Sequence, residues 1–281
     1  MARWRSRRTV KLDARSWQGT DRKKMPRAQA RRERLSRPIE DRWVMLRRHC
    51  ADEPSGLRLG RLLHRLTQDD PGVQESALAE LELATQLVCA GVRLSFLPES
   101  RARTADLECH LGHERFFVEV TAMVGSVARR RIPLCGVAEA DEQMEESRGM
   151  ILIHRILARV QQKAKQLADY CEPVVLQISV PHTDWQGWRA GRREDPWLDV
   201  KALAGAVTML LMNLPHLSAV LIALWDVEPL PSRAGISLAN VEVVERSRHH
   251  WAVPRVRMLV RNPRAHAPLT RRQVEVLREI L

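Results

Sequence analysis

Two uninterrupted apolar runs constrain the fold of this 281-residue chain more than any other feature of its sequence. They read PVVLQISV at residues 173–180 and AVLIALWDV at residues 219–227. Runs of β-branched and aliphatic residues without polar alternation are typical of strands that are buried on both faces of a sheet. Because a sheet buried in this way needs a layer on each side, the two runs predict a central sheet with helices on both faces.

Helical and strand patterns in the rest of the chain supply those layers. Apolar residues recur at helical spacing over residues 39–49, 56–68, 73–91, 141–170, 199–213 and 269–280. Further strand patterns cover residues 92–97, 105–111, 115–123 and 255–260. The succession predicts an α/β fold with a central mixed β-sheet flanked by helices on both faces. A chain of this length can bury a sizeable core, and we expect a single domain at residues 49–281 with its core at about 73–268.

The positive charge of the chain is confined to its first 48 residues. The whole chain has 46 Lys and Arg against 34 Asp and Glu. Residues 1–48 hold 17 and 5 of these, which leaves 29 of each sign in residues 49–281. We interpret residues 1–48 as a disordered basic tail, which can bind phosphate backbones without sequence preference. A plain disordered leader, or a start assigned upstream of the true one, explains the same composition.

Several classes of protein are disfavoured by motifs that the sequence lacks. No apolar run approaches the roughly 18 residues that a membrane span requires, and no apolar segment follows the basic N-terminus as in a secretory signal. The five cysteines are scattered without a CxxC pair, which favours reduced thiols in a cytoplasmic protein. A phosphate loop of the form GxxxxGK[ST] and a GxSxG elbow are also missing, which argues against a nucleotide hydrolase and a serine hydrolase.

The segment TADLECHLGHERFFVEVTA, residues 104–122, predicts a β-hairpin with two acidic side chains on one face. Gly112 suits the first central position of a two-residue turn, and the resulting register places Asp106 directly across from Glu119, with Cβ atoms about 5 Å apart. The apolar residues alternate onto the other face, which we expect to meet the core: Leu107, Cys109, Leu111, Phe116, Val118 and Val120. Facing carboxylates are destabilising unless a cation neutralises them, and Mg²⁺ binds through one or two carboxylates. The pair therefore predicts a divalent-metal site, with a polar face that meets only water as the alternative.

The order of these elements resembles the core of the PD-(D/E)XK nuclease superfamily over residues 73–268. The motifs that carry the resemblance are a helix with AELELA, a strand entry TAD ending in Asp106, VEVT with Glu119, the helix-then-strand ILARVQQKAKQLADYCEPVVLQIS, and the late segment RNPRAHAPL. The resemblance implies a restriction-endonuclease-like fold in which Asp106, Glu119 and the main-chain carbonyl of Val120 bind Mg²⁺ or Mn²⁺, with Glu80 as an assisting carboxylate. It further implies hydrolysis of a nucleic-acid phosphodiester bond, in DNA rather than RNA.

The sequence departs from that pattern at the position of the motif lysine, where Thr121 stands. A hydroxyl cannot supply a positive charge, so the alternative is a catalytically inactive protein of this fold that binds nucleic acid or serves as an assembly subunit. Lys163 lies beside the buried stripe of the following helix and Lys165 lies on its opposite flank, so we expect Lys163 to replace the missing lysine. Glu80 is preferred to Glu82 for the same reason of helical phase. A role on the solvated helix surface fits the spacing of each of these side chains as well.

A loop rich in tryptophan and arginine follows the strand at residues 173–180. Its candidate nucleic-acid-binding residues are Trp185, Trp188, Arg189, Arg192 and Arg193. Aromatic rings can stack on bases and guanidinium groups can pair with phosphates, whereas the same tryptophans also suit the cover of an apolar core edge. We expect a nucleic acid, and no membrane, as the partner, and a homodimer is compatible with the sequence.

Overall fold

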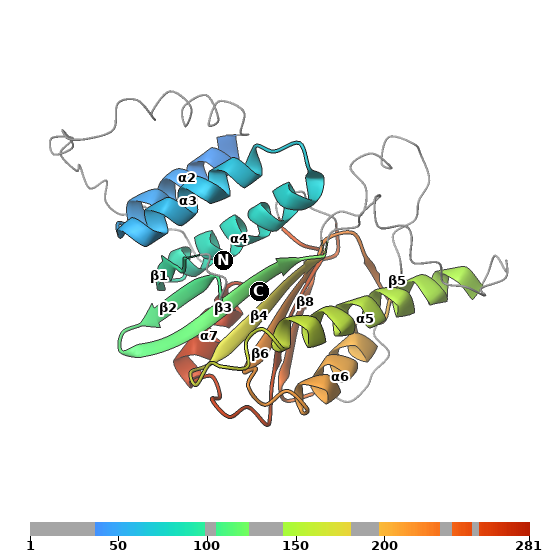
Figure 1. Cartoon of the computed structure of the whole chain (residues 1–281). Coiled ribbons are helices and arrows are strands. Elements are labelled where there is room, and N and C mark those ends of the chain that lie inside the picture. The colour runs from blue at the N-terminus through green and yellow to red at the C-terminus, as the bar shows by residue number, and fades with distance from the viewer. Residues whose placement is uncertain (1–36, 99–104, 124–142, 181–196, 231–237, 249–252) are drawn as a thin grey trace, which may run out of the picture.

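A seven-stranded mixed β-sheet forms the centre of the computed structural model, which describes residues 37–98, 105–123, 143–180, 197–230, 238–248 and 253–281. Its strand order is β1-β2-β3-β4-β6-β9-β8 (Figure 1). The strands are β1 (Arg93–Phe96), β2 (Leu107–Leu111), β3 (Glu114–Ala122), β4 (Val174–Val180), β6 (Ala219–Leu224), β8 (Val241–Glu245) and β9 (Val256–Arg261). Strands β3, β4 and β6 run parallel to one another, and the other neighbours are antiparallel. The α/β class and the mixed central sheet are confirmed.

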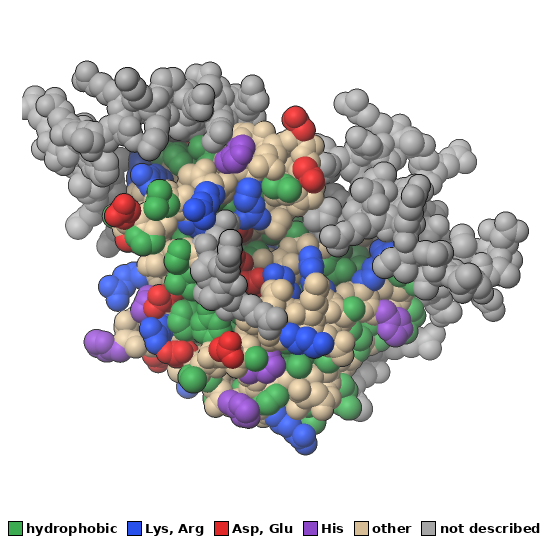
Figure 2. Space-filling model, viewed as in Figure 1, with side chains coloured by type: hydrophobic (Ala, Val, Ile, Leu, Met, Phe, Trp, Pro, Cys, Tyr) green, Lys and Arg blue, Asp and Glu red, His purple; other side chains and the backbone are tan. Residues whose placement is uncertain are grey.

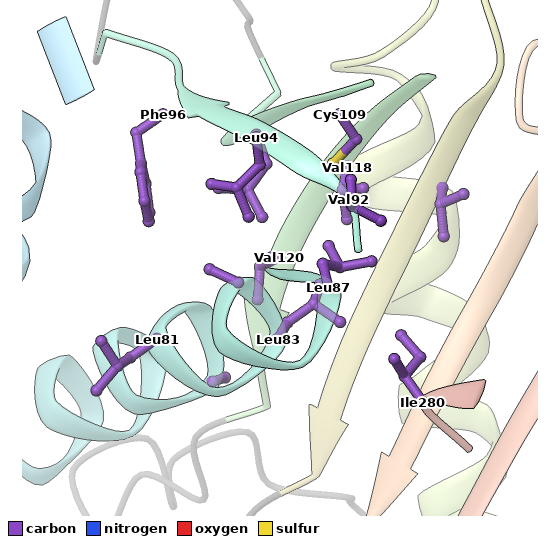
Figure 3. Packing of buried hydrophobic residues seen from close by; sticks show 14 of the residues in the cluster. Leu81, Leu83, Leu87, Val92, Leu94, Phe96, Cys109, Val118, Val120 and Ile280 are labelled. Carbon is purple, nitrogen blue, oxygen red and sulfur yellow. The ribbon is translucent and has the colours of Figure 1, made fainter. Parts of the chain in front are cut away.

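Helices cover both faces of this sheet, as the sequence predicts. They are α2 (Arg37–His49), α3 (Glu53–Leu66), α4 (Pro71–Cys89), α5 (Gln143–Ala164), α6 (Val200–Leu211) and α7 (Arg271–Glu279). On one face, α2, α3, α4 and α7 contribute to a core with Val118, Val120 and Leu221 of the sheet (Figure 3). On the other face, α5 and α6 form a second core with Leu176 and Ile222. The two apolar runs that predict doubly buried strands, β4 and β6, are buried at every residue.

Local capping residues set where several of these helices begin and end. The carboxylates of Asp52 and Asp70 accept hydrogen bonds from the first main-chain N–H groups of α3 and α4. Thr270 forms a reciprocal capping box with Gln273 at the start of α7. Helix α4 ends at Cys89 and is followed by Gly91, whose φ of 84° requires glycine and whose role as a helix stop is confirmed.

Some element boundaries differ from the expectations drawn from the sequence. Helix α5 ends at Ala164 rather than near residue 170, because the chain continues in turns in which Leu167 still contacts the core. The edge strand β8 was not expected, since its sequence VEVVE carries charged residues and only two partly buried ones. A separate two-stranded sheet pairs β5 (Trp197–Leu198) with β7 (Glu228–Pro229).

The expected tail at residues 1–48 is too long at its C-terminal end. Residues 37–48 belong to α2, where Leu46 is fully buried in the first core and the indole N–H of Trp43 donates to the carbonyl of Leu59. The folded part therefore begins by Arg37, because the amphipathic pattern of this segment outweighs its basic composition. Residues 1–36 lie outside the described part of the chain.

Two further expectations concern cysteines and membranes. Cys50, Cys89, Cys109 and Cys171 are free thiols, as predicted, and Cys135 lies outside the described residues. None of the helices in the described ranges combines the length and the apolarity that crossing a membrane requires.

Candidate functional site

The β2–β3 hairpin has the register that the sequence predicts. Leu107 pairs with Val118 and Leu111 with Glu114, on either side of a turn in which Gly112 has a φ of 66°, a left-handed value that favours glycine. The residues expected to face the core are buried: Leu107, Cys109, Leu111, Phe116, Val118 and Val120. The other side of β3 is covered too, since Phe117 belongs to the core beneath α5 and packs against the tilted ring of Tyr170, with 4.6 Å between ring centroids. The alternative of a polar face that meets only water is therefore wrong for this part of β3.

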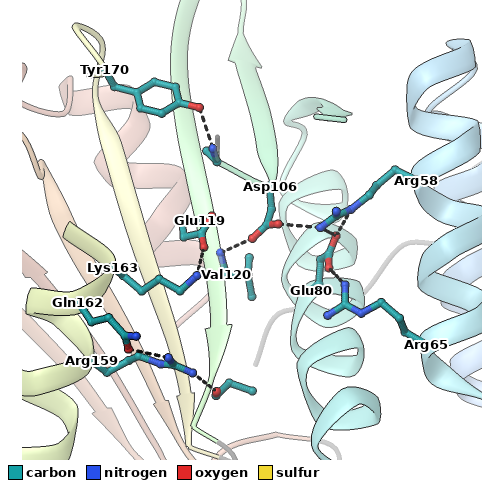
Figure 4. Close-up of polar contacts among 12 residues, drawn as sticks. Arg58, Arg65, Glu80, Asp106, Glu119, Val120, Arg159, Gln162, Lys163 and Tyr170 are labelled. Carbon is teal, nitrogen blue, oxygen red and sulfur yellow. Dashed lines mark hydrogen bonds and ion pairs between the residues drawn. The ribbon is translucent and has the colours of Figure 1, made fainter. Parts of the chain in front are cut away.

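Asp106 lies in a bend just before β2, one residue beyond the last regular pair of the hairpin. Its main-chain N–H donates to the carbonyl of Val118, and the regular ladder ends at the pair of Leu107 and Val118. Asp106 and Glu119 are therefore not a ladder pair, but their carboxylates lie close enough to share a hydrogen bond, as the predicted facing of the two acids requires. Asp106 Oδ2 also accepts a hydrogen bond of 2.8 Å from the main-chain N–H of Val120, which aims its carboxylate along β3 (Figure 4). The N–H of Ala105 donates to the hydroxyl of Tyr170 at 2.7 Å, so the approach to the bend is fixed as well.

Glu119 and Lys163 form an ion pair on the α5 side of the sheet. Lys163 Nζ donates to Glu119 Oε1 at 2.6 Å, with 20% of the lysine side chain and 7% of the glutamate side chain exposed. Lys163 stands in the last turn of α5, next to Ala164 of the buried stripe. The preference for Lys163 over Lys165 agrees with this geometry, because Lys165 is exposed and lies beyond the end of the helix.

Glu80 is joined to Asp106 through Arg58 of α3, and Arg65 of the same helix also pairs with Glu80. Arg58 Nη2 lies 2.7 Å from Asp106 Oδ1 and 3.0 Å from Glu80 Oε1, and Arg65 Nη1 lies 2.9 Å from Glu80 Oε2. Figure 4 shows the resulting arrangement, with α3 on one side of the carboxylates and α5 on the other. Glu82 is directed elsewhere, since it pairs with Arg257 at 2.8 Å, so the preference for Glu80 over Glu82 agrees with the geometry.

Burial and the repulsion between neighbouring acids raise the pKa of two of the three carboxylates, Glu80 and Glu119. Burial, followed by the charge of Asp106, raises the pKa of Glu80 to about 7, although Arg58 and Arg65 act in the opposite direction. The same two causes raise the pKa of Glu119 to about 7, against the lowering effect of Lys163, and a hydrogen bond shared with Asp106 also favours its protonated form. Asp106 therefore lies close to both glutamates, and the three acids and three bases Arg58, Arg65 and Lys163 form one electrostatic unit.

The donor set suits a small hard cation only in part. Carboxylate and carbonyl oxygens are the ligands that Mg²⁺ prefers, and it commonly binds through two carboxylates with water completing the shell. The repulsion between Asp106 and Glu119 indicates a place where added positive charge would be favourable. Within the described residues, however, no three His, Cys, Asp or Glu side chains lie together in a way that could hold a metal ion. A cation would thus rest on Asp106 and Glu119, with the main-chain carbonyl of Val120 beside them.

Thr121 occupies the expected position of the motif lysine and is buried on the side of β3 that carries Glu119. Lys163 approaches that glutamate from α5 and so brings the ammonium group that Thr121 lacks. The side chain of Val120 packs in the opposite core, so only its main chain is available to the site. Four of the sequence-predicted residues, Glu80, Asp106, Glu119 and Lys163, are thus brought together.

Arg58 and Arg65 are the two members of this unit that the sequence did not suggest. Both lie in GLRLGRLLHRL, where an arginine beside a leucine stripe is compatible with a solvated helix flank. The one signal in the sequence is the absence of any acidic residue between Glu53 and Asp69, the stretch that contains both arginines.

The candidate nucleic-acid-binding loop cannot be placed against this site. Trp185, Trp188, Arg189, Arg192 and Arg193 lie outside the described residues. Comparisons with known proteins give no further indication of function: no protein-family model, no curated protein and no solved structure matches this chain.

Proposed function

We propose that the protein is a metal-dependent nuclease that hydrolyses phosphodiester bonds in DNA. The observation that carries the proposal is the meeting of Lys163 with Glu119, at 2.6 Å, next to an Asp106 carboxylate anchored on the N–H of Val120. Paired carboxylates with an adjacent ammonium group, on one hairpin and one helix, match the needs of phosphodiester hydrolysis. The free thiols fit a cytoplasmic location for such an enzyme.

Each residue has a distinct role in this proposal. Asp106, Glu119 and the carbonyl of Val120 hold Mg²⁺ or Mn²⁺, which supplies positive charge that acidifies water and stabilises a phosphate as it gains negative charge. Lys163 places its amino group beside Glu119, where it orients the water that attacks phosphorus. Glu80 assists from α4 by holding Arg58 against Asp106.

A catalytically inactive protein that binds nucleic acid is the second candidate, and Thr121 favours it. The lysine of the motif has become a buried hydroxyl, and Arg58 already neutralises Asp106 and Glu80. In this case the same charges would serve only to stabilise the fold and to bind phosphate groups.

Incubation of supercoiled plasmid with the purified protein and Mg²⁺ or Mn²⁺ separates the two candidates. We expect nicked or linear products from the wild type, and a loss of at least about 100-fold in rate for Asp106→Asn, Glu119→Gln and Lys163→Met. Glu108→Gln, a partly buried acid on the same hairpin, and Lys165→Met are matched controls that should keep the wild-type rate. Retarded but uncut plasmid with either metal would refute the nuclease and support the binding protein. Cutting that survives in all three site variants would show a contaminating nuclease.

A further inference from the structure

Two helices that flank the carboxylates are basic along the stretches that border the site. Between Glu53 and Asp69 the chain has Arg58, Arg61 and Arg65 and no acidic residue. From residue 149 to residue 168, in and after α5, it has Arg155, Arg159, Lys163 and Lys165, again with no acidic residue. Residues 49–281 as a whole hold 29 basic and 29 acidic side chains, so these two stretches are a local departure from a balanced surface.

The basic residues of each helix lie on one side of it. On α3 they are three and four residues apart, at Arg58, Arg61 and Arg65, and on α5 four apart, at Arg155, Arg159 and Lys163, so that each set forms a stripe. At the helical rise the stripes extend over about 10 Å and about 12 Å. One strand of a DNA duplex carries a phosphate about every 3.4 Å along the axis, so each stripe can meet several of them.

Both stripes lead into the carboxylate cluster from opposite sides. Arg58 and Arg65 contact Asp106 and Glu80 from α3, and Lys163 contacts Glu119 from α5 (Figure 4). Arg61, which lies between Arg58 and Arg65 on α3, and Arg155, which lies two turns before Lys163 on α5, are exposed. In the space-filling view, basic side chains lie on two sides of a small acidic area near the centre of the molecule (Figure 2).

The charged side chains around the site are mostly positive, which favours the binding of a polyanion there. Three carboxylates, Glu80, Asp106 and Glu119, stand among six cations: Arg58, Arg61, Arg65, Arg155, Arg159 and Lys163. Arg58, Arg65 and Lys163 contact these acids directly, and Arg61, Arg155 and Arg159 add three more positive charges on the same two helices. Arg159 is held near the end of β3 by donating to the carbonyl of Ala122 at 3.2 Å, so its position is defined by the fold.

We propose that α3 and α5 form a two-sided basic clamp that binds the phosphate backbone of duplex DNA across the Asp106–Glu119 pair. The identity of the partner rests on the proposed nuclease function, whereas the clamp itself is a binding surface that can be tested without cleavage. Arg61 and Arg65 contact phosphates on one side of the site, and Arg155 and Arg159 contact them on the other.

Salt dependence of DNA binding tests the clamp directly. Affinity for a short fluorescein-labelled DNA duplex is measured by anisotropy in EDTA, at salt concentrations between 50 and 200 mM, with the full-length chain. Each phosphate contact adds about 0.9 to the slope of log K against log salt concentration. We expect the double variants Arg61→Gln/Arg65→Gln and Arg155→Gln/Arg159→Gln to lower that slope by about 2 each. The single variants Arg61→Gln and Arg155→Gln, at exposed positions, should lower it by about 1 each and guard against misfolding of the doubles.

Arg271→Gln/Arg272→Gln is the matched control. It removes the same charge from exposed positions of α7, which packs near the turn of the hairpin through Thr270 and Glu114, away from Asp106. An unchanged slope in the variants of either helix, or an equal fall in the control, would overturn the clamp. Plasmid cleavage by the wild type is scored separately. If the variants lower the slope but the wild type does not cut, the clamp stands and the nuclease proposal is refuted. If the wild type cuts but the variants do not change the slope, the nuclease proposal stands and the clamp is refuted.

Discussion

Replacement of Arg58 by methionine removes the charge that joins two of the buried acids while keeping most of the side-chain volume. The Arg58 side chain is 6% exposed, and its guanidinium group contacts both Glu80 and Asp106. Glu80, which is 2% exposed, would keep only Arg65 as a partner. Removing one member of a buried ion pair typically costs about 3–5 kcal/mol, because the remaining charge is left without compensation. We therefore expect Arg58→Met to lower the free energy of unfolding by this amount at pH 8.5.

The loss should depend on pH in a direction fixed by the pKa of Glu80. That pKa is already raised from 4.5 to about 7, first by burial and then by Asp106. An acid whose folded pKa exceeds its unfolded value binds an extra proton when folded, so its favourable contribution is complete at low pH and is lost as pH rises through 7. In the Arg58→Met variant the pKa rises further, and at pH 5.5 Glu80 is neutral. The expected cost there falls to about 1–2 kcal/mol, which reflects lost hydrogen bonds alone.

Urea unfolding followed by tryptophan fluorescence at pH 5.5 and 8.5 measures both values. Arg65→Met is the control, because Arg65 binds the other oxygen of Glu80 but its side chain is 24% exposed. Its removal should cost less than that of Arg58 at either pH. An equal cost of Arg58→Met at the two pH values would refute the electrostatic reasoning and show that the side chain stabilises the protein by packing.

Two further predictions address the metal site and the boundary of the fold. Binding of Mn²⁺, measured by electron paramagnetic resonance, should weaken about tenfold from pH 8 to pH 6. The reason is that Glu119, with its pKa of about 7, must lose a proton to bind the ion. An affinity that does not change with pH would show that Glu119 is not a ligand. Leu46→Ala in α2 should lower the free energy of unfolding by about 2–5 kcal/mol, and Leu57→Ala, 64% exposed, by less than about 0.5 kcal/mol; equal urea midpoints for the two variants would show that α2 does not belong to the cooperative fold.

The elements of the fold follow from patterns that are local in sequence. Strands β4 and β6 are continuous apolar runs, and the hairpin combines alternation with a glycine at its turn, so both could be predicted from a few adjacent residues. The end of α5 could not, because Leu167 keeps the helical spacing of buried residues although the chain has already turned at Lys165. Strand β8 lies at the edge of the sheet, where a half-exposed VEVVE segment leaves only a weak pattern.

The site was predictable only where the place of a side chain follows from the pattern of its own element. Asp106 and Glu119 follow from the hairpin, and Lys163 follows from its phase on α5. Arg58 and Arg65 depend on how α3 packs beside α4 and the start of β2, and spacing within one helix carries no information about that contact. The two carboxylates do lie close together, but outside the regular ladder, because the main-chain N–H of Val120 donates to the Asp106 carboxylate beyond the last ladder pair.

The hydroxyl of Tyr170 accepts the N–H of the residue that precedes Asp106, and Tyr170 is the only tyrosine in the chain. Biosynthetic labelling with 3-fluorotyrosine would therefore introduce one fluorine nucleus per molecule, at the entrance to the carboxylate cluster. Its single ¹⁹F resonance would report on the bend at Asp106 without a background from other positions. The binding of a metal ion, the binding of DNA and the protonation of the neighbouring acids could then be followed through this one resonance, without any substitution in the sequence.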